Sequence, residues 1–118
     1  MTAPNIVGVT TITGKTVGVA IGTSDTNIVA NAASSNKVLK INALLVSNVD
    51  GSAAADITLK IQKGGSTDYH IAKTLSVPAD STLDVLNKSI YLEENDILRA
   101  LASAASDLEV VCSYEEIS

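Results

Sequence analysis

Strict alternation of apolar and polar residues marks two segments of the chain. Residues 56–62, DITLKIQ, place Ile57, Leu59 and Ile61 on one side of an extended backbone and polar residues on the other. Residues 107–117, DLEVVCSYEEI, repeat the same two-residue period. Successive side chains of a β-strand point to opposite faces, so a period of two indicates a strand with one buried face. Both segments are therefore predicted to be half-buried strands.

A third apolar segment, residues 37–48, has the sequence KVLKINALLVSN and is also predicted to be a strand. The residues expected to face the core are Leu39, Ile41, Ala43 and Leu45. Leu44 and Val46 then lie on the opposite face and make it partly apolar. Together with Val111, they are the predicted contact surface for a partner.

Turn signals connect these strands. Asp50-Gly51 is a strong reversal signal because glycine tolerates the positive φ that tight turns require, so we expect residues 37–48 and 56–62 to form a hairpin. Gly64-Gly65 reverses the chain again and leads into residues 68–75, DYHIAKTL. The three strands are predicted to form a meander.

Residues 92–107, LEENDILRALASAASD, allow two interpretations. The segment contains good helix formers, and Asp96 could cap a helix there. Alternatively, EEND and SAASD are polar turns, and Leu98, Ala100 and Ala102 alternate inward between them. We favour a strand, as part of a hairpin, over the helix.

The first 35 residues are rich in Thr, Asn, Gly and Ala and differ from the rest of the chain. Strands are expected near Ile6–Ile12 and Val17–Ile21, and residues 30–36, ANAASSN, are typical of a loop. We therefore divide the chain into an N-terminal arm, residues 1–35, and a body, residues 36–118. The arm is expected to pack on the body or on a neighbouring subunit.

Residues 8–16, GVTTITGKT, resemble a phosphate-binding loop only at their end. Five residues separate Gly8 from Gly14, whereas the motif requires four before its Gly-Lys-Thr ending. The residues that follow alternate as a strand, although the motif must open a helix. We therefore expect Gly14-Lys15 to form a turn between two strands, with no nucleotide site.

Composition favours an all-β fold and restricts the partners. The chain has no Phe, no Trp and three Tyr, so aliphatic side chains must fill a thin sheet interior. Its formal net charge is -5, and its eight basic residues are dispersed, which argues against a nucleic-acid partner. No apolar run approaches the roughly twenty residues of a membrane span. We expect no membrane partner, no secretory signal and a cytoplasmic origin.

Few residues offer chemistry. Cys112 is the single cysteine and is expected to be a buried, inert thiol, and His70 is the single histidine and is expected on a strand surface. Glu93, Glu94 and Asp96 lack the spacing of a twelve-residue calcium loop and are expected to solvate a turn. We therefore predict no catalytic residues, no metal site, no cofactor and no enzymatic activity.

Residues 36–117 combine three sequence features. An apolar strand ending in Ser-Asn precedes a second strand, a Pro-containing turn follows in SVPADS, and LEEND leads into a closing strand ending SYEEI. In this combination the body resembles a small virion structural protein of tailed bacteriophages. The resemblance implies an all-β antiparallel sandwich, jelly-roll-like, with about eight short strands.

The resemblance also implies a function without enzymatic activity. The expected role is capsid decoration or cementing that stabilises the head shell by bridging capsomers, with a tail, neck or fibre-associated or glycan-binding module as the alternative. The expected partners are the major capsid protein or other virion proteins and further copies of the chain, expected as a trimer, in a virion assembled in the host bacterial cytoplasm. The candidate interface residues are Leu44, Val46, Val111, Asp50, Gly51, Tyr69 and Tyr91.

Overall fold

The computed structural model describes residue 8 and residues 10–118. This part of the chain forms nine strands, and the prediction of an all-β antiparallel sandwich is confirmed. The strands are β1 (Ile12–Ile21), β2 (Thr26–Ala30), β3 (Val38–Asn48), β4 (Ala55–Lys63), β5 (Thr67–Val77), β6 (Thr82–Asp84), β7 (Ile90–Leu92), β8 (Ile97–Ala102) and β9 (Leu108–Ile117).

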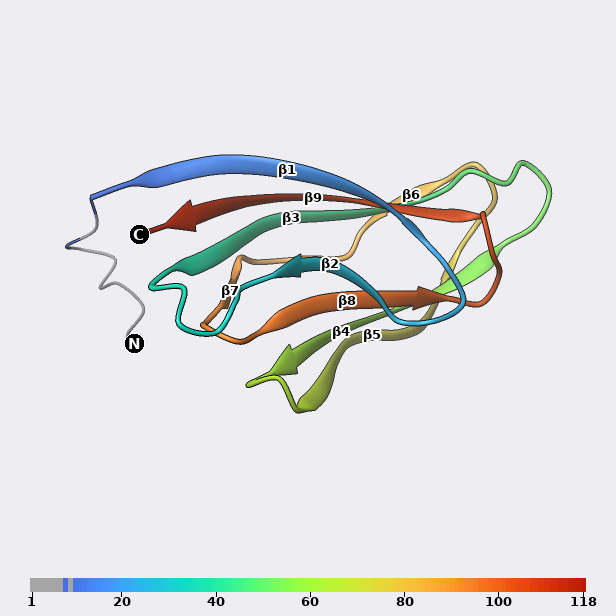
Figure 1. The fold of residues 1–118 in the computed structure, drawn as a ribbon. Helices are drawn as coiled ribbons and strands as arrows, with labels where there is room; N and C mark the ends of the chain where they lie inside the picture. The colour runs from blue at the N-terminus through green and yellow to red at the C-terminus, as the bar shows by residue number, and fades with distance from the viewer. Residues whose placement is uncertain (1–7, 9) are drawn as a thin grey trace.

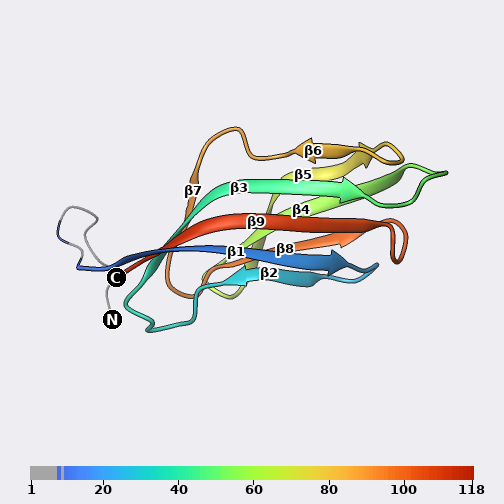
Figure 2. The ribbon, with the colours of Figure 1, turned by 90° about the horizontal axis from the view of Figure 1, so that it is seen from above.

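The strands form two stacked sheets (Figure 1). The first sheet has the order β1-β9-β3-β6, with β7 also paired to β3, and the second has the order β2-β8-β4-β5. Seen from above, β1, β9 and β3 run side by side along the length of the molecule (Figure 2). The two sheets pack face to face, as in other sandwiches.

The pairings are nested in the sequence. β4 pairs with β5, β3 with β6 and β7, β2 with β8, and β1 with β9. The chain is thus one long hairpin wrapped around a core, which is the topology of a jelly roll. Since β6 and β7 occupy the same edge of β3, they act as one interrupted strand, and eight strand positions result.

Two predicted hairpins are wrong, although their strands exist. β3 and β4 lie in different sheets, so the Asp50-Gly51 segment carries the chain across the sandwich instead of reversing it within one sheet. β8 and β9 also lie in different sheets. A turn signal shows that the chain changes direction, but the partner of each strand depends on which apolar faces meet across the core. The meander therefore reduces to one hairpin, β4–β5, closed at Gly64 and Gly65, which have φ of 61° and 72°.

Residues 97–102 form strand β8, so the strand interpretation of this segment is correct and the helix alternative is wrong. Leu98, Ala100 and Ala102 are buried and alternate with half-buried residues. The positive φ of Asn95 and Ser106 places a tight bend on each side of the strand. The two bends confirm that polar turns flank the apolar segment.

The predicted turn at Gly14-Lys15 is wrong, because both residues lie inside the ten-residue strand β1. The strand expected at Val17–Ile21 is the second half of β1. Of the strand expected near Ile6–Ile12, residues 6, 7 and 9 lie outside the described residues, and of the remaining positions only Ile12 belongs to a strand, as the first residue of β1. β1 and β2 are edge strands of the two sheets, hydrogen-bonded to β9 and β8.

A β-bulge in β3 decides which of its residues reach the core. The register against β9 shifts between Ile41 and Ala43. Beyond the shift, Leu44 and Val46 are fully buried, whereas Ala43 and Leu45 are only half-buried. One extra residue moves all later side chains to the opposite face. The inward assignment of Ala43 and Leu45 is therefore wrong, and Leu44 and Val46 are core residues instead of surface residues.

Candidate functional site

The remaining candidate interface residues do not form one patch. Val111 lies in the middle of β9, on the outer face of the first sheet, and its side chain is 43% exposed. Tyr91 lies on β7, opposite Lys40 of β3, and is 41% exposed. Tyr69 lies on edge strand β5 of the other sheet and is 58% exposed. These three exposed candidates therefore lie apart, on two different sheets.

Val111 lies between a residue of β1 and a residue of β3 on the outer face of the first sheet. Its cross-strand neighbours are Gly18 on β1 and Leu45 on β3. Leu45 is half-buried, and a Cβ placed at Gly18 would meet nothing within 4 Å. Val111 therefore has a glycine on one side and a half-buried leucine on the other, and its own surface is open to solvent.

Asp50 and Gly51 lie in the connection between β3 and β4, and Asp50 has a local structural role. Its Oδ1 accepts hydrogen bonds from the backbone N–H of Ser52 at 3.0 Å and from the Ser52 hydroxyl at 2.9 Å. These bonds lower the pKa of Asp50 below its ordinary value, because they stabilise the carboxylate. A Cβ at Gly51 would contact the Asp80 carboxylate at 3.5 Å. The two residues shape a connection between the sheets.

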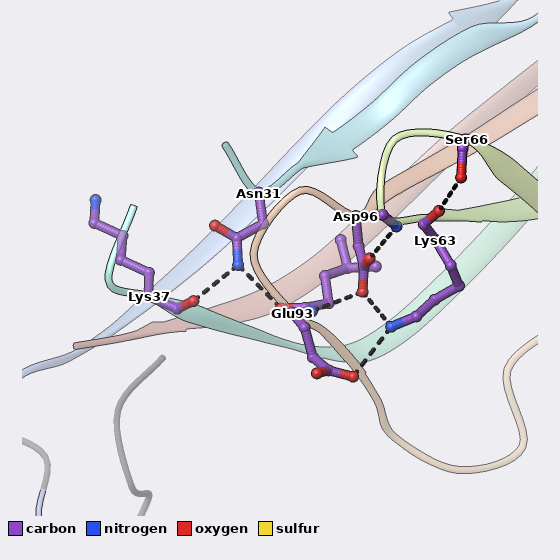
Figure 3. Close-up of polar contacts among 8 residues, drawn as sticks. Asn31, Lys37, Lys63, Ser66, Glu93 and Asp96 are labelled. Carbon is purple, nitrogen blue, oxygen red and sulfur yellow. Dashed lines mark hydrogen bonds and ion pairs between the residues drawn. The ribbon is translucent and has the colours of Figure 1, made fainter. Parts of the chain in front are cut away.

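Asp96 holds two turns together (Figure 3), in the β7–β8 connection at the end of the sandwich opposite the β3–β4 connection (Figure 1). Its Oδ1 accepts a hydrogen bond from the backbone N–H of Gly64 at 3.0 Å. Its Oδ2 accepts a hydrogen bond from the backbone N–H of Glu93 at 2.9 Å and forms an ion pair with Lys63 Nζ at 2.5 Å. The hydrogen bond that the Lys63 Nζ donates to Asp96 raises the pKa of Lys63. Asp96 is only 1% exposed, and three donors satisfy its carboxylate. It therefore acts as a structural joint between the β4–β5 turn and the turn before β8.

A charged cluster covers the outer face of the second sheet, and the sequence analysis missed it. Lys60 contacts Asp25 at 2.8 Å and Asp68 at 3.5 Å, and Asp68 lies 3.9 Å from Arg99. The hydrogen bond with Asp25 raises the pKa of Lys60. Alternation placed Lys60 on the outer face, but only the pairing of β4 with β8 brings it beside Arg99. The buried Nε of Arg99 has no hydrogen-bond partner among the described residues.

A second ion-paired group lies near the C-terminus. Glu116 on β9 contacts Lys37 at 2.7 Å and Lys15 at 3.0 Å. The hydrogen bonds from Lys37 and Lys15 lower the pKa of Glu116, because both cations favour its carboxylate. Three segments distant in sequence are joined here: the start of β1, the residue before β3 and the end of β9.

The two residues with nucleophile or base chemistry lie apart. Cys112 is fully buried in the core of the first sheet, and burial raises the pKa of its thiol to about 11. His70 is exposed on β5 of the second sheet, opposite Lys60. The expectation of a buried thiol is confirmed, and the imidazole lies on a strand of the other sheet.

Within the described part of the chain, no pocket and no group of three potential metal ligands is found. The same residues contain no helix long and apolar enough to span a bilayer.

No protein-family model matches the chain, and no curated protein matches its sequence. Solved structures do share its fold. A chain of the Bacillus endospore appendages, which form disulfide-linked pili, superimposes with a TM-score of 0.54 at 18% identity over 92% of this chain and 88% of that chain. A chain from the acid-stable capsid of Helicobacter pylori bacteriophage KHP30 superimposes with a TM-score of 0.56 at 9% identity over 93% of this chain and 90% of that chain. At these identities the comparisons show the sandwich fold, in proteins that build pili and capsids.

Proposed function

We propose that this chain is a non-enzymatic structural protein of a bacteriophage virion, most specifically a capsid decoration or cement protein. The observation that supports this most is the fold, which resembles a phage capsid chain over 93% of its length. The phage pattern of residues 36–117 agrees with that likeness. The Bacillus pili are disulfide-linked, whereas the single cysteine of this chain is buried in the folded state, which makes the phage comparison the better guide.

The proposed mechanism is multivalent contact with the shell. The outer face around Val111 presents an apolar side chain, and the Asp96 joint fixes the shape of two turns at one end of the sandwich. A rigid module of this kind can bridge neighbouring capsomers at many identical positions, and multiple weak contacts then become collectively durable. The partners are the major capsid protein or other virion proteins, and the location is the virion, assembled in the host cytoplasm.

The first test is the copy number of the chain in purified parent particles, measured by quantitative mass spectrometry against the major capsid protein. A decoration or cement role predicts a number comparable with that of the capsid protein. A handful of copies per particle would contradict the shell role and favour the neck, tail or fibre.

The second test is shell stability with and without the protein. Shells carrying it should rupture at a higher temperature than shells lacking it, and equal temperatures would reject the cement role. Val111→Asp should fold but lose the effect if the outer face of the first sheet contacts the shell. Leu75→Asp is the matched control, because Leu75 is also an exposed apolar strand residue, at 39%, but lies on β5 of the second sheet.

A glycan-binding module of the tail or fibre is the second candidate, favoured by two exposed tyrosines. Tyr69 and Tyr91 present aromatic rings to solvent, and sugar rings stack on such faces. Specific binding on a glycan array that is lost with Tyr69→Ala or Tyr91→Ala would support this candidate. Binding unchanged in both variants would remove the tyrosines from the site.

The chain is also proposed to act as a homo-oligomer. The trimer expected from the sequence stays a prediction, and the mass of the isolated protein in solution tests it.

A further inference from the structure

The two sheets present four edges with different backbone geometry. An edge strand exposes unpaired N–H and C=O groups, and proteins usually protect such edges by short strands or bulges. Three of the edges carry these protections. β2 has five residues with a register shift between Asn27 and Val29, and β6 and β7 have three residues each. β5 shifts register twice against β4 and contains Thr74 at φ 48°.

The fourth edge, β1, has neither protection. Its ten residues pair with β9 without any register shift, from Ile12 opposite Ile117 to Ile21 opposite Leu108. The strand contains no proline. Its only charged residue, Lys15, is paired with Glu116 and not spread over the edge. β1 is therefore a long, regular strand with one open side among the described residues.

The hydrogen bonds between Thr11 and Ser118 show which backbone groups of β1 bond to β9 and which stay unpaired. Thr11 donates to and accepts from Ser118, at 3.0 and 2.9 Å. In an antiparallel ladder, residues alternate between pointing both backbone groups at the partner and pointing both away. The odd-numbered residues of β1 therefore bond to β9. The residues whose N–H and C=O point away from β9 are Ile12, Gly14, Thr16, Gly18 and Ala20.

The side chains of β1 leave this edge accessible. Four of the five outward-bonding residues are small, and a Cβ placed at Gly14 or Gly18 would meet nothing within 4 Å. Val17 and Val19 lie on the inner face of the strand, where they pack against the core but stay half-buried. A further strand alongside β1 would continue the ladder and cover both valines.

We propose that β1 pairs antiparallel with β1 of a second copy of the chain, joining the two first sheets into one continuous sheet. Such pairing requires a regular, unpaired strand on the partner, and among the described edges of this chain β1 alone provides one. Like strands that pair in this way are related by a two-fold axis, so the contact closes as a dimer. In the register we propose, Val17 lies opposite Val19 of the second copy. This register buries both valines of each copy and keeps the two Lys15 side chains apart.

This pairing goes beyond the proposed function, because it concerns the isolated chain and holds whether or not the protein is part of a virion. It predicts a dimer in place of the trimer expected from the sequence. Copy number in particles and shell stability do not measure it, so either proposal can fail while the other stands.

The test is the mass of the purified full-length protein over a range of concentrations, by sedimentation equilibrium, for wild type, Thr16→Pro and Thr16→Val. The Thr16 N–H points away from β9, so proline removes no hydrogen bond within the monomer but removes two across the two-fold dimer, one from each copy. Wild type and Thr16→Val should dimerise, and Thr16→Pro should weaken dimerisation at least about tenfold while the far-ultraviolet circular dichroism spectrum is unchanged. A monomer at all concentrations, a trimer, or equal dimerisation of the two variants overturns the proposal.

Amide hydrogen exchange of the wild-type protein provides a second measurement that needs no variant. The Gly18 N–H should exchange at least about tenfold more slowly in the concentrated than in the dilute protein, whereas the Val17 N–H, already bonded to β9, should change much less. Equal exchange of Gly18 at both concentrations also overturns the proposal.

Discussion

Asn31 and Asn48 make equivalent side-chain hydrogen bonds at two successive connections between the sheets, β2–β3 for Asn31 and β3–β4 for Asn48. Each is buried, with 3% of its surface exposed, and each donates two hydrogen bonds from its side-chain Nδ2. One bond goes to a carbonyl in its own connection, at 2.9 Å for Asn31 and 3.0 Å for Asn48. The other goes to the last residue of a distant strand, Leu92 of β7 for Asn31 and Val77 of β5 for Asn48. The two amides thus tie the connections to the strands beside them.

Asn48→Ala should destabilise the fold by about 1–3 kcal/mol, because it removes the side-chain donor to the buried Val77 carbonyl and to the partly buried Ala53 carbonyl. Urea unfolding followed by circular dichroism measures the change in the free energy of unfolding. Asn42→Ala is the control: Asn42 is exposed and bonds Glu115 at the surface, so its loss should cost at most about 0.5 kcal/mol. Equal costs for the two variants would contradict the bridging role of Asn48.

Asp96→Asn should destabilise the fold by about 2–3 kcal/mol, since the amide cannot accept from both backbone donors and also pair with Lys63. Glu93→Gln removes the other carboxylate beside Lys63, but that side chain is 72% exposed. Its cost should be at most about 1 kcal/mol. Thermal unfolding of both variants makes the comparison, and a larger loss for Glu93→Gln would show that the joint is misassigned.

Leu44→Ala should cost about 2–5 kcal/mol, because it opens a cavity in the core. Leu45→Ala should cost less, since Leu45 is only half-buried on the outer face. Equilibrium unfolding in guanidinium chloride ranks the two. The reverse order would mean that the β-bulge between Ile41 and Ala43 is absent and that the simple alternation of the sequence holds.

Glu116 should contribute to acid sensitivity. Its pKa is lower in the folded state than its ordinary value of 4.5, because Lys37 and Lys15 stabilise the carboxylate. A lowered folded pKa gives stability that is present above the unfolded pKa and is lost as the pH falls through the folded pKa. Glu116→Gln should therefore be less stable than wild type near neutral pH and should lose less stability between neutral pH and pH values below 4.5. Parallel stability-against-pH curves for the two proteins would exclude this contribution.

Cys112 should resist thiol reagents in the folded protein. Its pKa is raised to about 11 and the side chain is fully buried, so thiolate and access are both lacking near neutral pH. Reaction with an aromatic disulfide reagent, followed by absorbance, should be slow in buffer and fast in denaturant. Rapid and complete modification of the folded protein would contradict the burial of this strand face.

The sequence by itself determined the fold class and most strand positions. Ile57, Leu59 and Leu98 are buried as their alternation predicts, because side-chain direction in a regular strand follows directly from residue parity. Cys112 was also placed correctly in the core by the pattern of its own strand. These features depend on local backbone geometry, which neighbouring residues specify.

Only the tertiary structure decided which strands pair, which residues of β3 face the core, and which distant side chains come into contact. The Asp50-Gly51 turn signal is local, but whether β4 returns beside β3 or crosses to the other sheet depends on how two apolar faces cover each other. One bulge reversed the faces of Leu44 and Val46 and removed them from the predicted surface. Contacts such as Lys60 beside Arg99, and the open edge of β1, arise between segments distant in the chain. Periodicity fixes which way a side chain points within its strand, whereas long-range packing fixes what it meets.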